Sequence, residues 1–208
     1  MAGGGRALRC HDAGVAAPSE ELLDVVVGLL AEHGFEGLSI RRVAARAGVS
    51  IGAVQHHYPT KDALLAAAMR RVDDQVSAEL AERVQRARTP GEALRAVSEG
   101  LVPAGPEERP AAVVWLAQVA RAAVHEPTAV GYRASWQRVE DALSRLIAAA
   151  RPGLRAEQVR DEAAVLLALL DGLATARVAE PDRVTGDRAR RLVGRHLDAL
   201  LTPTGDRT

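Results

Sequence analysis

Hydrophobic side chains recur at helical spacing near the start of the chain. The residues on this face are Leu22, Val26, Leu29 and Leu30. Ser19 and the two glutamates after it supply a capping hydroxyl and negative charge, both of which stabilise a helix N-terminus. At the other end, Gly34 can adopt the left-handed conformation that terminates a helix, and Phe35 can fold back onto the preceding turn. The pattern predicts a helix that begins at Ser19 and ends near Gly34.

Two short helices separated by a tight turn are predicted next. Ser39 is suited to cap the first of them, and the apolar positions after it repeat with a helical period. These positions are Ile40, Val43, Ala44 and Ala47. Gly48 and Val49 interrupt the helix, and Ser50 can cap the one that follows. The spacing is therefore that of a helix, a tight turn and a helix.

The second short helix, SIGAVQHHY (50–58), has few apolar positions for a core helix. Val54 and Tyr58 supply its apolar stripe. The other positions are mostly small or polar: Ile51, Gly52, Ala53, Gln55 and His56. Small residues allow a close approach to another surface and leave polar groups beside the contact. Such a helix suits the groove of another molecule.

Positive charge flanks this helix, although the chain as a whole has a formal net charge of zero. Arg41 and Arg42 precede it, Lys61 is the only lysine, and no acid occurs between Arg41 and Asp62. Lys61 also lies in the first turn of a helix that Thr60 can cap, where a cation is unfavourable unless an anion is bound. One such cation alone is ordinary solvated surface, whereas the whole arrangement is what contacts to DNA phosphates require.

The remainder of the chain is typical of an all-α protein. Aromatic residues make up only 2% of the sequence and hydrophobic residues 48%, which favours alanine-lined helix contacts over a β-sandwich. A long amphipathic helix is predicted over residues 63–87 and breaks at Thr89 and Pro90. The Pro/Gly-rich residues 102–110 are predicted to form a loop rather than a domain boundary. The Gly/Ala-rich residues 1–18 are predicted to be a disordered tail.

A hydroxyl residue, a turn motif and a closing motif follow one another within about residues 22–65. These are Ser39, VAARAGVS (43–50), Gly52, Val54 and HHYPTKDALL (56–65). In this order they resemble the pattern of the TetR family of transcription regulators. The resemblance implies a helix-turn-helix DNA-binding domain of three helices over residues 19–65. A larger helical domain for effector binding and dimerisation would follow over residues 66–208.

The resemblance also implies a function and a set of partners. Family members are homodimers, and most repress transcription at a double-stranded DNA operator until a small-molecule effector lowers their affinity for DNA. We therefore expect a cytoplasmic, ligand-responsive repressor with no cofactor and no enzymatic activity. Two alternatives remain: a DNA-binding protein without an effector, and an all-helical enzyme that uses a polar residue such as His125 or Asp171 in a C-terminal cavity.

Positions that match the family's motif carry the expected DNA contacts. The DNA-binding candidates are Ser39, Arg41, Arg42, Ser50, Ile51, Gly52, Ala53, Gln55, His56, His57 and Lys61. Gln55 departs from the pattern, which usually has tyrosine there; its amide can donate to a phosphate or pair with adenine. Ile51 has two interpretations, contact with a thymine methyl group or a contact at the edge of the core.

The C-terminal half offers candidates for an effector pocket and a dimer interface. Its aromatic and polar residues are Trp115, Gln118, His125, Tyr132 and Trp136, which line a pocket or belong to the core. Two late segments, 157–178 and 188–201, have a second apolar face in addition to one that packs on the domain itself. The interface candidates are Val165, Leu169, Gly172, Ala176, Leu192, Val193, His196 and Leu200. This half is similar to the betaine-regulator-like branch of the family, from which alone we infer no choline-type ligand.

Several other kinds of chemistry are not supported by the sequence. Cys10 is the only cysteine, so an intramolecular disulfide and a cysteine metal cluster are excluded. His56 and His57 are adjacent and would point about 100° apart on a helix, which disfavours a shared metal ion. No apolar segment is long enough for a signal peptide or a membrane span, and we expect no contact with a membrane.

Overall fold

The computed structural model describes residues 19–202, and these form nine helices and no strand. The prediction of an all-α fold is confirmed. Cys10 and the predicted tail lie outside the described residues. The helices are α1 (Ser19–Gly37), α2 (Ile40–Ala47), α3 (Ile51–His57), α4 (Lys61–Arg86), α5 (Pro90–Gly100), α6 (Arg109–Ala122), α7 (Glu126–Ala150), α8 (Ala156–Ala179) and α9 (Gly186–Leu201).

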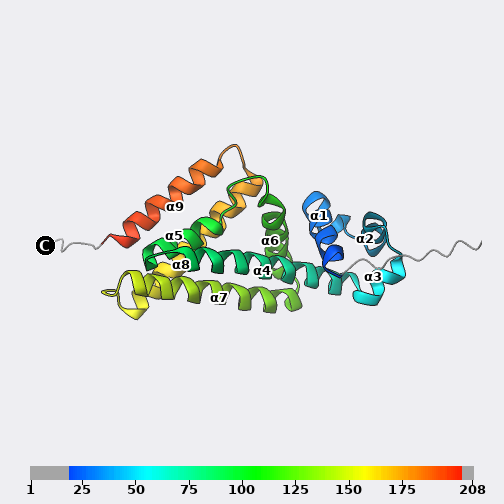
Figure 1. The fold of residues 1–208 in the computed structure, drawn as a ribbon, viewed down its shortest axis with the longest axis horizontal. Helices are drawn as coiled ribbons and strands as arrows, with labels where there is room; N and C mark the ends of the chain where they lie inside the picture. The colour runs from blue at the N-terminus through cyan, green and yellow to red at the C-terminus, as the bar shows by residue number, and fades with distance from the viewer. Residues whose placement is uncertain (1–18, 203–208) are drawn as a thin grey trace, which may run out of the picture.

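Helices α1, α2 and α3 form one end of an elongated molecule, and α4 runs from them into a bundle with α5, α7, α8 and α9 (Figure 1). The predicted caps at Ser39, Ser50 and Thr60 are confirmed. The side-chain oxygens of Ser39, Ser50 and Thr60 accept from the backbone N–H three residues on, at 3.2, 3.1 and 3.0 Å. Gly48 ends α2 in the left-handed conformation with φ of 68°. These caps set the boundaries of the predicted helix-turn-helix.

Helix α1 is interrupted where the sequence predicted its end. Gly34 has φ of 63°, a conformation that favours glycine, and breaks the helix before its last residues. The break brings the Phe35 carbonyl oxygen within 2.9 Å of Lys61 Nζ, which donates a hydrogen bond to it.

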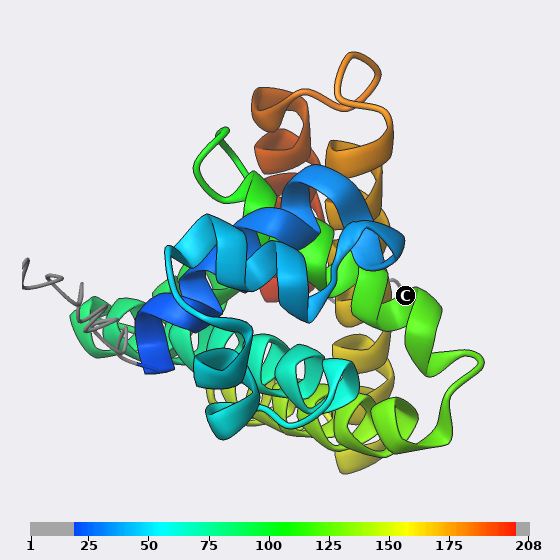
Figure 2. The same ribbon diagram turned by 90° about the vertical axis from the view of Figure 1, so that its right-hand side faces the viewer.

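Two hydrophobic cores divide the described residues. The first holds together α1, α2, α3 and the start of α4, and it extends beyond residue 65 to Met69 and Val72. It also includes Val114 of α6, which is 1% exposed. The second core lies among α5, α7, α8 and α9 and is built around fully buried residues such as Leu94 and Ile147. Helix α6 is therefore attached to the DNA-binding end as well as to the bundle (Figure 2).

Within residues 19–202, no helix combines the length and apolar character needed to cross a membrane.

Candidate nucleic-acid interface and internal polar cluster

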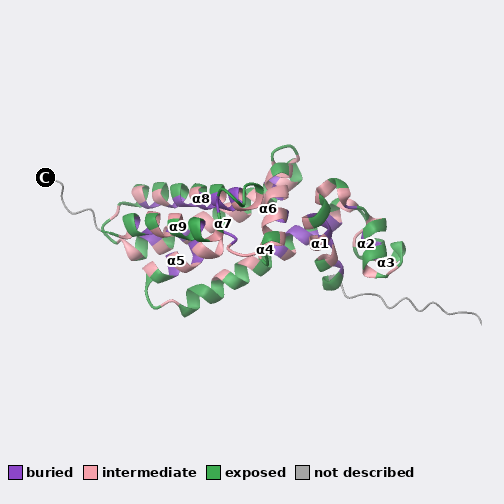
Figure 3. Ribbon diagram, turned by 90° about the horizontal axis from the view of Figure 1, so that it is seen from above, coloured by how far each residue is buried: buried purple, intermediate pink, exposed green. Residues whose placement is uncertain are grey.

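The predicted DNA-binding residues gather on the α2–α3 end of the molecule. Most of them are exposed (Figure 3), and only Ala53 and Lys61 are half-buried. Val54 is fully buried and anchors α3 to the first core, so the other faces of this short helix are left open. A methyl group added at Gly52 would meet nothing closer than the Ser50 hydroxyl, at 3.8 Å. The chain itself thus has room for a side chain there, and the close approach that glycine permits is directed outward.

Ile51 is 46% exposed and does not belong to either core. The structure therefore excludes the interpretation of Ile51 as a core contact. An exposed isoleucine at the start of α3 leaves an apolar group available for a partner.

The positive charge of this surface is smaller than the sequence suggested. Arg46 binds both carboxylate oxygens of Glu32 on α1, at 2.6 and 2.7 Å, so this arginine has an acidic partner after all. The sequence missed the pair because the two residues lie 14 positions apart and meet only when α1 packs against α2. Arg42 donates to the Gly37 carbonyl oxygen and has no acidic partner among the described residues. The Arg41 side chain is exposed and, within residues 19–202, makes no hydrogen bond or ion pair.

Lys61 is held in place by its hydrogen bond to the Phe35 carbonyl oxygen. An ammonium group has three protons, so this bond leaves two for an anion. The next residue, Asp62, is paired with Arg121 of α6 at 2.6 Å. The charge nearest to Lys61 is thereby compensated, and Lys61 itself has no carboxylate partner in the described part of the chain.

Three of the predicted pocket residues form one aromatic stack. The ring centroids of Trp115 and Trp136 are 5.8 Å apart, and those of Tyr132 and Trp136 are 5.0 Å apart. Trp136 Nε1 donates to a carboxylate oxygen of Asp171 at 2.8 Å. Trp115 Nε1 is buried and has no hydrogen-bond partner in the described part of the chain. The stack thus combines aromatic faces, a carboxylate and an unsatisfied donor.

Gln118 adjoins the same region, where it faces Asp73 of α4. Asp73 also accepts from the Ser135 hydroxyl at 3.4 Å. Burial raises the pKa of Asp73, while hydrogen bonds from Ser135 and Gln118 act in the opposite direction. Asp73 was not among the residues predicted for a pocket. It lies four residues after Met69 and three before Val76, on the apolar face of α4, which was the signal that could have identified it.

Asp171 and Tyr132 have shifted titration behaviour for related reasons. Burial raises the pKa of Asp171, and the hydrogen bond from Trp136 lowers it in part. Burial, assisted by the nearby charge of Asp171, raises the pKa of Tyr132 to about 12. Neither Asp73 nor Asp171 has an ion-pair partner among the described residues. The cluster therefore contains two partly buried carboxyl groups whose charge the chain does not balance with a salt bridge.

His125 does not join this cluster. It caps α7 instead: its Nδ1 accepts from the backbone N–H of Thr128 at 3.3 Å, and its Nε2 lies 3.4 Å from a guanidinium nitrogen of Arg121. His125 thus contacts Arg121 and Thr128 at the turn between α6 and α7, apart from the aromatic stack.

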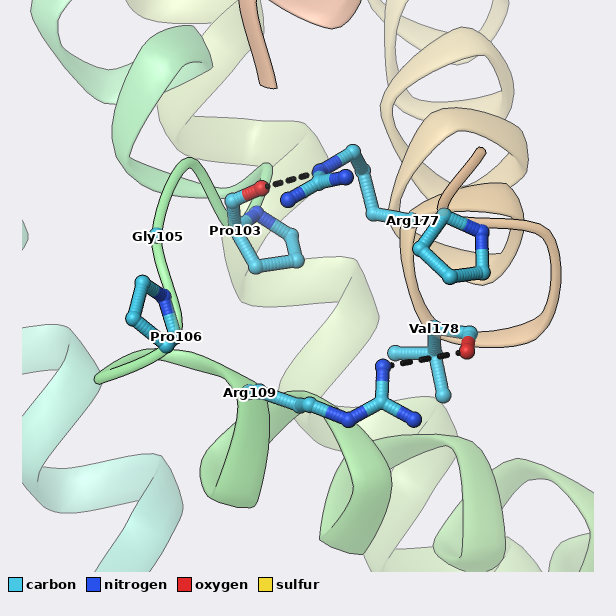
Figure 4. Close-up of a pocket in the computed structure, with 7 residues that line it drawn as sticks. Pro103, Gly105, Pro106, Arg109, Arg177 and Val178 are labelled. Atoms are coloured by element: carbon cyan, nitrogen blue, oxygen red, sulfur yellow. Dashed lines mark hydrogen bonds between the residues drawn. The ribbon is translucent and has the colours of Figure 1, made fainter. Parts of the chain in front are cut away.

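A separate cavity of about 240 Å³ lies between the loop before α6 and the end of α8 (Figure 4). Arg177 donates to the Pro103 carbonyl oxygen at 2.9 Å, and Arg109 to that of Val178 at 3.1 Å. None of the predicted pocket residues lines it. Its arginines tie the two segments of backbone together.

The predicted interface residues divide into two groups. Val165 is 55% exposed and Gly172 is exposed, while Leu169, Leu192 and His196 are half-buried. In contrast, Ala176, Val193 and Leu200 are buried in the second core of the same chain. These three cannot offer their side chains to a partner, because their own domain already covers them, and that part of the prediction is corrected.

A capped helix-turn-helix with an exposed second helix, joined to a helical bundle, defines the molecule as a helix-turn-helix DNA-binding protein. Residues 22–68 match the family described as bacterial regulatory proteins of the tetR family, and residues 90–202 match the BetI-type transcriptional repressor C-terminal family. The chain belongs to the TetR family of transcriptional regulators and has a BetI-type C-terminal domain. This family consists of regulators, not enzymes, so the enzyme alternative is set aside.

Individual relatives cover most of the chain. The chain is 31% identical over 184 residues to the transcriptional regulator PksA of Bacillus subtilis, covering 87% of this chain and 88% of PksA. It is also 31% identical over 185 residues to the regulator BetI of Burkholderia mallei, covering 88% and 93%.

Solved structures agree on the fold. A transcriptional regulator from Rhodococcus sp. RHA1 superposes with a TM-score of 0.78 at 35% identity, over 88% of this chain and 95% of that one. A regulator from Saccharomonospora viridis, solved in complex with choline, superposes with a TM-score of 0.79 at 20% identity, over 86% and 94%.

Proposed function

We propose that this regulator is a dimeric repressor that binds a near-palindromic operator and is released by a small-molecule effector. The observation that carries the proposal is the α2–α3 surface: an exposed short helix flanked by Arg41, Arg42 and Lys61, none of which has a carboxylate partner among residues 19–202. Two such helices, one from each protomer, would enter successive major grooves. Arg41 and Ile51 would face base edges, and Arg42 and Lys61 would contact phosphates.

The proposed dimer uses the exposed face of α8 together with part of α9. Val165 and Gly172 are the exposed positions, and Leu169, Leu192 and His196 continue the face at its half-buried edge. His196 Nε2 is buried without a hydrogen-bond partner among residues 19–202. Packing of these helices on a symmetry mate would cover the apolar groups in an isologous four-helix arrangement.

The proposed effector site is the cluster of Trp115, Trp136, Tyr132 and Asp171, and we propose an organic cation as its ligand. Aromatic faces attract cations by about 0.5–2 kcal/mol per favourable contact, and a cation would balance the partly buried carboxylate of Asp171. The choline complex of the Saccharomonospora viridis regulator makes choline the first compound to test.

The first experiment is selection of bound duplexes from a random DNA pool by the purified protein. Recovery of a palindromic site, with affinity that falls steeply with salt, is the expected result. Weak binding without sequence preference would refute the repressor proposal. On the recovered site, choline is then titrated against the wild type and Asp171→Asn. Release of the wild type at lower choline concentration than the variant is expected. Operator binding that choline and other organic cations leave unchanged would favour effector-independent DNA binding.

A further inference from the structure

Helix α6 contributes Val114, and at the edge Ala111, to the first core, and other side chains to the polar cluster. Val114 is buried against α1 in the first core, while Trp115 and Gln118 face the cluster proposed to bind the effector. Residues that are seven apart return to nearly the same face of a helix, so Arg121 continues the face of Val114. The ribbon shows α6 standing between the α1–α3 end and the bundle (Figure 1).

Arg121 makes a second, polar attachment to the DNA-binding end. One of its guanidinium nitrogens binds Asp62 Oδ1 at 2.6 Å in the first turn of α4. Its guanidinium carbon also lies 5.9 Å from the centroid of the Phe35 ring, after the break in α1. Both partners adjoin Lys61: Asp62 follows it in the chain, and the Phe35 carbonyl oxygen accepts its hydrogen bond.

The same guanidinium group also holds the corner between α6 and α7. Arg121 Nε donates to the Thr128 hydroxyl at 3.3 Å, and the His125 ring nitrogen lies 3.4 Å from the nitrogen that binds Asp62. The Arg121 side chain is only 24% exposed. It therefore joins α1 and α4 of the DNA-binding end to the beginning of α7, the helix that carries Tyr132 and Trp136.

Val114 and Arg121 attach α6 to the DNA-binding end at two levels of the helix, within its wider packing on α1. At 1.5 Å per residue, Arg121 lies roughly 10 Å along α6 from Val114. The apolar contact at Val114 tolerates rotation about itself, because hydrophobic contacts are not directional. The directional bond from Arg121 to Asp62 restricts that rotation. A displacement of α6 at Trp115 or Gln118 would thus be transmitted to both attachments.

We propose that Arg121 is the positioning residue that sets the orientation of the helix-turn-helix relative to the C-terminal bundle, and so transmits effector binding to α3. The geometric half of the proposal, the positioning of the helix-turn-helix, concerns one chain. The regulatory half, the transmission of effector binding, rests on the proposed function, and the two halves are tested separately.

The geometric half is tested by the distance between two spin labels in one chain. Cysteines are placed at the exposed positions Ala45 on α2 and Asp141 on α7, with Cys10→Ser as the background. Labelled chains are mixed with an excess of unlabelled Cys10→Ser chains, so that any dimer carries one labelled protomer. We expect a single narrow distance distribution that broadens or shifts in Arg121→Ala. Asp62→Asn should produce the same change, and combining both should add little.

Arg133→Ala is the matched control. Arg133 forms an equally short ion pair, at 2.6 Å, with Glu126, but both residues belong to α7 and the pair joins no two parts of the molecule. An Arg121→Ala distribution identical to the wild type, or an equal change in Arg133→Ala, would overturn the proposal. Arg121→Lys retains the charge without the planar fork and serves the same comparison if the alanine variant does not fold.

The regulatory half is tested on the selected operator with choline as the probe. The ratio of operator affinities without and with choline should fall by on the order of tenfold in Arg121→Ala, while choline affinity in the absence of DNA stays unchanged. An unchanged ratio beside a changed label distance would reject transmission but retain positioning. Failure to select an operator would reject the proposed function and leave the distance measurement to decide positioning.

Discussion

The salt dependence of operator binding should identify which cations of the α2–α3 surface contact phosphates. Lys61→Met removes the charge of Lys61 and keeps an apolar stem of similar length, which limits the loss of packing at this half-buried position. Because Lys61 has no carboxylate partner in the described part of the chain, its charge is available to displace a counterion from DNA. We expect the variant to bind all DNA sequences more weakly, by similar factors.

The magnitude follows from the release of counterions. Each phosphate neutralised on duplex DNA contributes about −0.9 to the slope of log affinity against log salt concentration. A dimer has two copies of Lys61, so the variant should be less steep by about 1.8. Between roughly 50 and 200 mM salt, the wild type should therefore lose about twelvefold more affinity than Lys61→Met. Fluorescence anisotropy with a labelled operator at several salt concentrations measures this difference directly.

The ion pair of Arg46 with Glu32 provides the control. Replacing both residues by alanine removes one positive and one negative charge, and the pair is already compensated within the folded chain. We expect this double variant to retain the slope of the wild type. A Lys61→Met slope equal to that of the wild type would show that its bond to the Phe35 carbonyl oxygen is its whole role. If the double variant changed the salt slope as much as Lys61→Met does, the absence of a carboxylate partner would not identify the cations that contact phosphates.

Three further predictions concern specificity, pH and stability. Arg41→Ala should lose about 1–3 kcal/mol of discrimination at one base pair of each half-site, measured with operators altered one position at a time. Burial raises the pKa of Asp171, so the protonated side chain stabilises the fold fully below the ordinary aspartate pKa, and this stabilisation is lost as pH rises through the raised pKa. In Asp171→Asn, the free energy of unfolding measured in urea should lack this pH dependence. Thr89→Ala removes the hydroxyl that accepts from the Glu92 N–H at 3.1 Å, and should lower the unfolding free energy by about 1 kcal/mol in a thermal or urea titration.

The fold and the DNA-binding surface were predictable because their signals are local. Ser39, Ser50 and Thr60 cap helices within three residues of themselves, and Gly34 and Gly48 end helices through their own backbone conformation. Caps and left-handed glycines depend little on distant packing, so a sequence displays them directly.

What the sequence could not show depends on contacts between distant residues. No acid occurs between Arg41 and Asp62, and Arg46 meets Glu32 only because α1 packs beside α2. The three interface candidates on α8 and α9 that proved buried could not be distinguished from exposed ones by periodicity. A helix with two apolar faces requires two partners, but the pattern does not say which face meets the chain's own core. His125 was assigned to the pocket by composition, whereas its place at an N-cap follows from the turn between α6 and α7.

The division of α6 between two cores has a consequence for how such a chain can respond to a ligand. Helix α4 connects the two parts of the molecule, since it is long and follows α3 directly. The structure adds α6 as a second connection, through Val114 and Arg121. Two connections in different helices restrict the orientation of the DNA-binding end more than one long helix does, so under the proposal a displacement of α6 would rotate that end. By linkage, a ligand that weakens operator binding through such a rotation must itself bind the DNA-competent state less tightly. The factor by which its own affinity falls equals the factor by which it weakens operator binding.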